Sequence, residues 1–119
     1  MKKVMVLGAT PNRKRFAHTC VKSLMRYDYP VIPLGIKEGK IAGIPIQVGK
    51  PQIKDLDTVT VYLNPENQKH YYDYLIDLEP RRIILNPGAE NEELRTIAEK
   101  KGIDVIEDCT LVMLNSGQF

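Results

Sequence analysis

The fold is decided by the stretch VMVLGATPNRKRF, residues 4–16, near the start of the chain. It opens with an apolar run typical of a buried strand, and it continues through the small residues Gly8 and Ala9. Three cations then precede an amphipathic run, in which apolar residues recur at helical spacing from Phe16 to about Tyr27. A buried strand therefore leads through a turn of small residues into a helix.

The same alternation continues along the rest of the chain. Further strands are expected at 30–35, 57–63, 81–86 and 103–108, with helices from Asn64 to Pro80 and over 89–102. Residues 37–51 are rich in Gly and Pro, which indicates a loop with short extended pieces. Strands that alternate with helices pair in parallel through right-handed crossovers.

We therefore expect residues 1–119 to form a single α/β domain, with a three-layer, doubly wound, mainly parallel sheet of Rossmann type. Such sheets bind ligands outside the carboxyl ends of the strands, where the strand order reverses. The first strand usually flanks that point. Residues 8–16 form the loop that leaves it, so this loop is the first candidate for a binding site.

Composition and charge exclude several classes of protein. The net charge of +2 is too small to indicate a nucleic acid or a membrane surface as partner. No apolar run approaches the ~20 residues that span a bilayer, and Pro11 interrupts the short apolar start. Two distant cysteines indicate neither a disulfide framework nor a metal site. We expect a cytoplasmic protein with no metal. The sequence is compatible with either a monomer or a homo-oligomer.

The loop after the first strand has the features of an anion site. Gly8 lacks a Cβ and permits close approach of the backbone, while Thr10 offers a hydroxyl. The start of the following helix offers unpaired N–H groups, and Arg13, Lys14 and Arg15 add cations suited to phosphate. Taken alone, the loop is equally compatible with a turn whose cations are only solvated.

The pattern argues against a dinucleotide as the phosphate ligand. A GxGxxG fingerprint would place glycines where Thr10 and Arg13 stand. It would also place an acid after the second strand to hold the ribose, but that strand ends PLGIK, residues 33–37. A Walker loop is absent as well.

Several short motifs occur in a fixed order along the chain. They are residues 8–12 (GATPN) with Arg15, Pro33 at the end of the second strand, GKIAGIPI at 39–46, NPE at 64–66, Gly88 before NEE at 91–93, and Cys109. Each motif is weak alone. The ordered set resembles the small CoA-binding proteins, whose fold resembles the CoA-binding domain of succinyl-CoA synthetase.

The resemblance implies a protein that binds coenzyme A or an acyl-CoA. Gly8, Ala9 and Thr10 would then approach the pyrophosphate through backbone N–H groups and the Thr10 hydroxyl, with charge from Arg13 and Arg15. The adenosine side would be lined by Pro33, Leu34, Gly35, Ile36, Lys40 and Ile41, and the pantetheine path would be bordered by Asn64, Pro65, Asn86 and Gly88.

The remaining chemistry-bearing residues point to no catalytic set. Cys20 belongs to the apolar stripe of the first helix, and Cys109 is interpreted as a small, partly buried residue rather than a redox site. His18, at the start of the first helix, could reach a phosphate but is expected to be an exposed surface residue, and His70 has no partner for acid–base chemistry. We expect a non-catalytic binding protein. An NAD(P)-binding oxidoreductase-type domain and a ligand-free interaction domain are the alternatives.

Overall fold

The structure, a computed structural model, describes residues 2–119 and has the α/β architecture expected from the sequence. Its main sheet contains five parallel strands in the order β2-β1-β5-β6-β7. These strands are β1 (Lys3–Leu7), β2 (Val31–Leu34), β5 (Leu56–Val61), β6 (Arg82–Leu85) and β7 (Asp104–Glu107).

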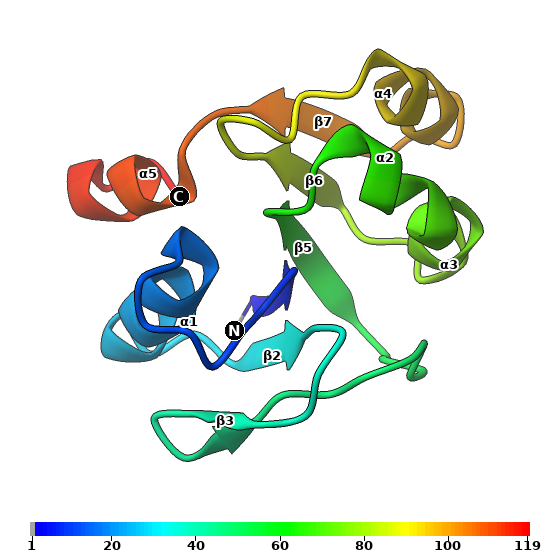
Figure 1. Cartoon of the computed structure of the whole chain (residues 1–119). Helices are drawn as coiled ribbons and strands as arrows, with labels where there is room; N and C mark the ends of the chain where they lie inside the picture. The colour runs from blue at the N-terminus through cyan, green and yellow to red at the C-terminus, as the bar shows by residue number, and fades with distance from the viewer. Residues whose placement is uncertain (1) are drawn as a thin grey trace.

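Helices cover both faces of this sheet (Figure 1). On one face lie α1 (Phe16–Arg26) and α5 (Thr110–Ser116); on the other lie α2 (Pro65–Gln68), α3 (Tyr72–Asp77) and α4 (Glu92–Glu99). The sheet and its two helical layers confirm the doubly wound, three-layer fold.

The strand order reverses at β1. The chain passes from β1 to β2 on one side and then returns to β5 on the other side of β1. Such a switch point separates the loops that leave the two central strands, and it is where open α/β sheets bind ligands. Here these loops are the segment after Leu7 and the segment after Val61.

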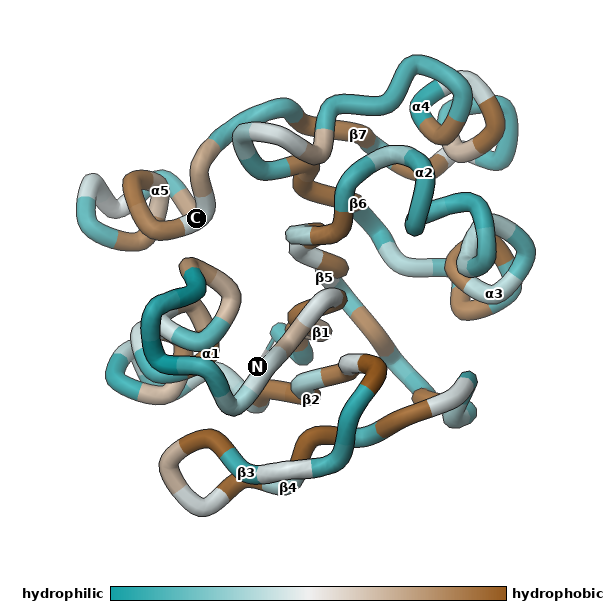
Figure 2. Tube along the Cα trace, viewed as in Figure 1, coloured by the Kyte–Doolittle hydropathy of each residue, from teal (hydrophilic) through white to brown (hydrophobic). Residues whose placement is uncertain are grey.

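Burial on both faces explains the continuous apolar run of β1. Val4 and Val6 belong to the core beneath α1, whereas Met5 and Leu7 belong to the core beneath α3 and α4. Alternate side chains of a strand point to opposite faces, so a strand covered on both sides is apolar throughout. Figure 2 shows this contrast, with hydrophobic residues in the strands and hydrophilic residues in the loop before α1.

Two helical segments differ in extent from the sequence-based expectation. The helix expected from Asn64 to Pro80 is divided into α2, a 3₁₀ turn (Lys69–Tyr71) and α3. Tyr71 has φ −114° and ψ 0°, which departs from the α-helical backbone and separates the pieces. The helix α1 starts and ends within one residue of its predicted bounds, with Ala17, Cys20, Val21 and Leu24 on its buried face.

The sequence-based interpretation missed one helix and one hairpin. The helix α5 is only seven residues long and is recognisable mainly by its packing, since Met113 and Leu114 are buried. The hairpin joins β3 (Lys40–Ile41) to β4 (Ile44–Pro45), and Ala42 and Gly43 form its turn with φ of 48° and 86°. Two successive positive φ values are typical of a tight hairpin turn. Among residues 2–119, no helix has the length and apolar character needed to cross a bilayer.

Candidate functional site

A pocket of about 550 Å³ lies at the switch point of the sheet. Its volume falls within the range of small-molecule sites. Three segments form its walls, namely the loops that follow β1 and β2 and the region from the end of β5 through the 3₁₀ turn. The lining residues are Gly8, Ala9, Thr10, Pro11, Asn12, Arg15, Gly35, Ile36, Lys37, Leu63, Asn67, His70 and Tyr71.

The loops after β1 and β2 rest directly on each other. The amides of Gly8 and Ala9 both donate to the Leu34 carbonyl, at 2.9 and 3.0 Å. A Cβ at Gly35 would overlap the Ala9 carbonyl oxygen, so this close approach requires glycine. The two amides that the sequence assigned to a phosphate already have an acceptor. Gly8 and Ala9 therefore shape the pocket through close backbone approach instead.

The start of α1 carries no side-chain cap. Its N-cap residue is Arg15, whose backbone is extended (φ −91°, ψ 142°) and whose side chain makes no capping hydrogen bond. Arginine has no acceptor atom, so it cannot satisfy the first amides of a helix. Within the described residues, the Phe16 and Ala17 amides have no hydrogen-bond acceptor. These donors and the positive end of the helix favour an anion at this position.

Hydrogen bonds within the loop hold its shape without a ligand. The Asn12 amide donates to Thr10 Oγ1 at 3.2 Å, and Asn12 Oδ1 accepts from the Lys14 amide at 3.0 Å. The Asn12 carbonyl accepts from the Arg15 amide at 3.2 Å. The loop therefore approaches the helix in a defined conformation, which reduces the ordering cost of binding.

The charges that line the pocket are positive. Arg15 comes from the first loop and Lys37 from the second, and no Asp or Glu is among the described lining residues. Ile36 lies beside Lys37 and is 81% exposed, which is unusual for a large apolar side chain. Two cations and an exposed apolar surface suit a ligand that combines phosphate with an aromatic base.

Six of the residues predicted for the site line this pocket together: Gly8, Ala9, Thr10, Arg15, Gly35 and Ile36. Arg13 is exposed but does not line the pocket. The sequence-based prediction did not include the other lining residues, which are Pro11, Asn12, Lys37, Leu63, Asn67, His70 and Tyr71. Their position after a strand at the switch point is the signal that could have identified them.

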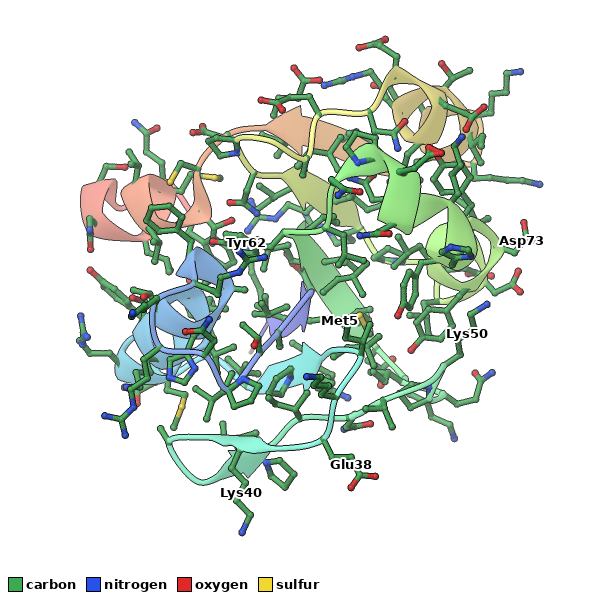
Figure 3. The ribbon with its side chains drawn as sticks, in the orientation of Figure 1. Met5, Glu38, Lys40, Lys50, Tyr62 and Asp73 are labelled. Atoms are coloured by element: carbon green, nitrogen blue, oxygen red, sulfur yellow. The ribbon has the colours of Figure 1, made fainter. Side chains whose placement is uncertain are left out.

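The other predicted residues of the adenosine side lie outside the pocket lining. Pro33, Leu34 and Ile41 are buried, and the last of these belongs to the core beneath α1. Lys40 points outward from the hairpin (Figure 3). These positions support the second loop from behind or lie beyond it.

The residues predicted for the pantetheine path also lie outside the pocket lining. Asn64 caps α2, because its Oδ1 accepts from the Asn67 amide at 2.9 Å, and Pro65 occupies the first helical position. Gly88 has a φ of 93° and donates to Glu90 Oε1. Two of these three residues thus have a local role in helix capping, and the third lies in a turn.

Asn86 is 1% exposed and connects three elements. Its Nδ2 donates to Thr60 Oγ1 and to the Val61 carbonyl, at 2.7 and 2.9 Å. Its Oδ1 accepts from the Thr110 amide at 2.9 Å. Thr60 and Thr110 are joined by their hydroxyls at 2.8 Å. This network links β5 and β6 to the start of α5. Its hydrogen bonds engage both polar side-chain atoms of Asn86.

The structure corrects the expectation that His18 is exposed. Its side chain lies in the first turn of α1 and is 4% exposed, with Nδ1 at 2.8 Å from the Thr10 carbonyl oxygen. Its Nε2 is buried and has no hydrogen-bond partner within the described residues. His70, by contrast, is exposed at the pocket wall.

The two cysteines differ in environment. Cys20 is fully buried as predicted, and burial raises the pKa of its thiol to about 12, so it stays protonated at neutral pH. Burial also raises the pKa of Tyr62, which lies toward α1 and α5 (Figure 3). Cys109 is partly buried at the start of α5. Among residues 2–119, no three His, Cys, Asp or Glu side chains are grouped as a metal site.

Comparison with known proteins agrees with this architecture. A solved structure of an uncharacterised protein is 45% identical, has a TM-score of 0.97 and covers 100% of this chain and 98% of its own. A Thermus thermophilus protein, cell-free ID.343, is 22% identical with a TM-score of 0.86, covering 99% and 90%. A hypothetical protein from Pyrococcus horikoshii OT3 is 21% identical with a TM-score of 0.85, covering 97% and 82%.

A search of curated proteins gave no match. One family profile, described as a CoA binding domain, matches residues 2–115. The match includes the strand order reversal, both loops that meet there and all the residues that line the pocket. This chain belongs to the CoA-binding domain family.

Proposed function

We propose that this protein binds coenzyme A or an acyl-CoA in the pocket at the switch point, as a binding protein rather than an enzyme. The observation that carries the proposal is the uncapped start of α1. Its cap residue, Arg15, is a cation and lines a pocket whose described walls contain no acid. Unpaired helix amides and a guanidinium together favour a multiply charged phosphate group. Membership of the CoA-binding family supports the same ligand.

In this proposal the pyrophosphate lies against the start of α1. Arg15 binds it with two parallel hydrogen bonds, and Thr10 adds its amide, which has no acceptor within residues 2–119. Gly8 and Ala9 let the phosphates approach the backbone closely, and Arg13 contributes charge from outside the lining. The first loop thereby holds the charged centre of the ligand.

The loop after β2 then receives the adenosine. Ile36 offers an exposed apolar surface to the purine, and Lys37 places a cation where a dinucleotide-binding protein would have an acid. A phosphorylated ribose fits a cation better than the free ribose diol of NAD. Gly35 fixes how closely this loop approaches the first loop. The residues behind or beside it are Pro33, Leu34, Lys40 and Ile41.

The remaining wall of the pocket receives the pantetheine arm. Tyr71 and Leu63 provide apolar surface there, and Asn67 provides an amide for the polar groups of the arm. Asn64 and Pro65 orient the helix start next to this wall, and Asn86 and Gly88 support the neighbouring strand end. The proposal covers the whole chain as a single CoA-binding domain in the cytoplasm.

Titration calorimetry tests this proposal directly. CoA titrated into the purified protein should give saturable heat with a stoichiometry of one per chain. NAD under the same conditions should bind at least tenfold more weakly. No saturable heat with CoA at millimolar concentration, or equal affinity for NAD, would contradict the proposal.

A further inference from the structure

We propose that His18 is a positioning residue for the phosphate loop: it holds the Thr10 carbonyl by a hydrogen bond and so fixes the conformation in which the loop binds its ligand. This inference rests on the proposed function, because it assigns a part in CoA binding to a side chain outside the pocket. His18 does not line the pocket, whereas Thr10 does.

The contact determines which nitrogen of the imidazole carries the proton. Nδ1 lies 2.8 Å from the Thr10 carbonyl oxygen. A carbonyl oxygen only accepts hydrogen bonds, so Nδ1 must be the donor. The neutral ring then has a bare Nε2, and this is the atom that is buried without a partner among the described residues. The structure therefore assigns the Nδ1–H tautomer to His18.

The bond engages the Thr10 carbonyl, which the hydrogen bonds within the loop leave without a donor among the described residues. Thr10 is followed by Pro11, so their peptide link has no N–H group and the Thr10 carbonyl is its only polar group. A free carbonyl beside a phosphate site would repel the anion by its partial negative charge. His18 engages this oxygen from a buried position, while Thr10 Oγ1 accepts from the Asn12 amide.

Fold stability alone gives no reason for a histidine at this position. The ring is 4% exposed, and one of its two polar atoms has no partner within residues 2–119. An unpaired buried polar atom is unfavourable, and an apolar side chain of similar size avoids it. If His18 serves ligand binding, we expect it to hold a pocket loop even at a cost in the stability of the fold.

Three variants separate positioning from a structural role. His18→Leu removes the donor and fills the space. His18→Asn keeps an N–H donor close to the position of Nδ1, whereas His18→Gln moves its amide one methylene further out. We expect His18→Leu and His18→Gln to weaken CoA binding about tenfold and His18→Asn to bind within about threefold of the wild type. His18→Leu should melt at the same temperature as the wild type or higher.

Equal CoA affinity for the Asn and Gln variants would overturn the inference. This comparison does not depend on whether the Leu variant folds. Wild-type affinity in His18→Leu would overturn it as well. A matched control, Thr19→Leu, places a leucine at the next, exposed position of α1, which does not line the pocket, and should leave CoA affinity unchanged.

A second readout needs no ligand. Long-range ¹H–¹⁵N correlation spectra of the wild-type protein should show His18 protonated at Nδ1, and the Asn12 amide should exchange faster in His18→Leu than in His18→Asn. An Nε2–H tautomer would overturn the inference. If the wild type binds no CoA, the proposed function is overturned, and these spectra alone decide whether His18 holds the loop.

Discussion

Three helices that start at the carboxyl edge of the sheet, α1, α2 and α4, fall into two kinds. At α4, Asn91 accepts from the Leu94 amide at 3.0 Å, and at α2, Asn64 accepts from the Asn67 amide at 2.9 Å. At α1, Arg15 occupies the same position and provides no acceptor. The capped helices satisfy their own first turn, while α1 leaves donors for something outside the chain.

The polar groups around these helix starts show the same contrast. Asn91 Nδ2 donates to Gln68 Oε1 and to the Tyr72 hydroxyl, and Gln68 Nε2 donates to the carbonyls of Leu63 and Ala89. This buried network is satisfied internally and serves the fold. The first turn of α1, by contrast, has amides without an acceptor within residues 2–119, and the pocket beside it has a cationic wall. Stability and binding therefore depend on different stretches of one sheet edge.

The largest expected effect is on the contact that joins the two pocket loops. Gly35→Ala places a Cβ against the Ala9 carbonyl, so the backbone must shift. We expect a loss of about 3 kcal/mol in the free energy of unfolding, measured by urea denaturation, because overpacking against rigid backbone is costly. Gly39→Ala is the control, since its Cβ would meet side chains rather than backbone, those of Pro11 at 3.2 Å and Ile46 at 3.6 Å. Equal losses for both variants would show that the loops are not locked at Gly35.

The second effect concerns affinity rather than stability. Arg15→Ala should weaken CoA binding by one to two decades, because losing a charge-assisted hydrogen bond costs ~1.5–3 kcal/mol. Lys14→Ala removes the neighbouring exposed charge, which does not line the pocket, and should have a smaller effect. Calorimetric titration of CoA at two salt concentrations measures both. Wild-type CoA affinity in Arg15→Ala would show that the cations of this loop are solvated surface charges that take no part in binding.

The capped side of the comparison predicts the opposite pattern. Asn91→Ala removes the cap of α4 and leaves Gln68 Oε1 without its partner. We expect a loss of about 2 kcal/mol in the free energy of unfolding, since a cap is worth about 1 kcal/mol and a buried unpaired acceptor adds a similar amount. CoA affinity should not change. A fall in affinity without a fall in stability would contradict the division of roles.

The smallest effect is expected for a substitution that gives α1 the side-chain cap that it lacks. Arg15 already has the extended backbone of an N-cap, so Arg15→Asn should let the side chain accept from the first-turn amides. We expect a gain of about 1 kcal/mol in the free energy of unfolding, together with weaker CoA binding. Lys14→Asn removes the same charge without adding a cap and should give no gain. A loss of stability in Arg15→Asn would mean that the first turn is already satisfied.

Much of the fold followed from patterns that are local in sequence. Apolar runs and helical spacing gave the five strands of the main sheet and the helices α1 and α4, because each pattern is complete within its own segment. The helix α5 was missed because its seven residues have no cap that the sequence reveals. Its first amide bonds to Asn86, 24 residues away. The backbone break at Tyr71 was missed because no Gly or Pro marks it in the sequence.

The site was predicted in part for the same reason. The loop at Gly8–Arg15 carries its own chemistry, so the sequence alone indicates Thr10 and Arg15 as candidates, and both line the pocket. Asn67, His70 and Tyr71 reach the pocket only because the strand order reverses between β1 and β5. Conversely, the burial of His18 depends on how α1 packs, which side-chain type alone does not reveal.

The central claim is that the pocket at the switch point selects CoA over a dinucleotide. The most direct test is the shift in melting temperature with CoA, NAD and NADP, each at the same concentration. A ligand at ~100 times its dissociation constant adds about 2.7 kcal/mol, which raises the melting temperature of a domain this size by roughly 10 °C. We predict a shift of this size with CoA and clearly smaller shifts with NAD and NADP. Equal shifts with all three, or a larger shift with NADP, would contradict the claim.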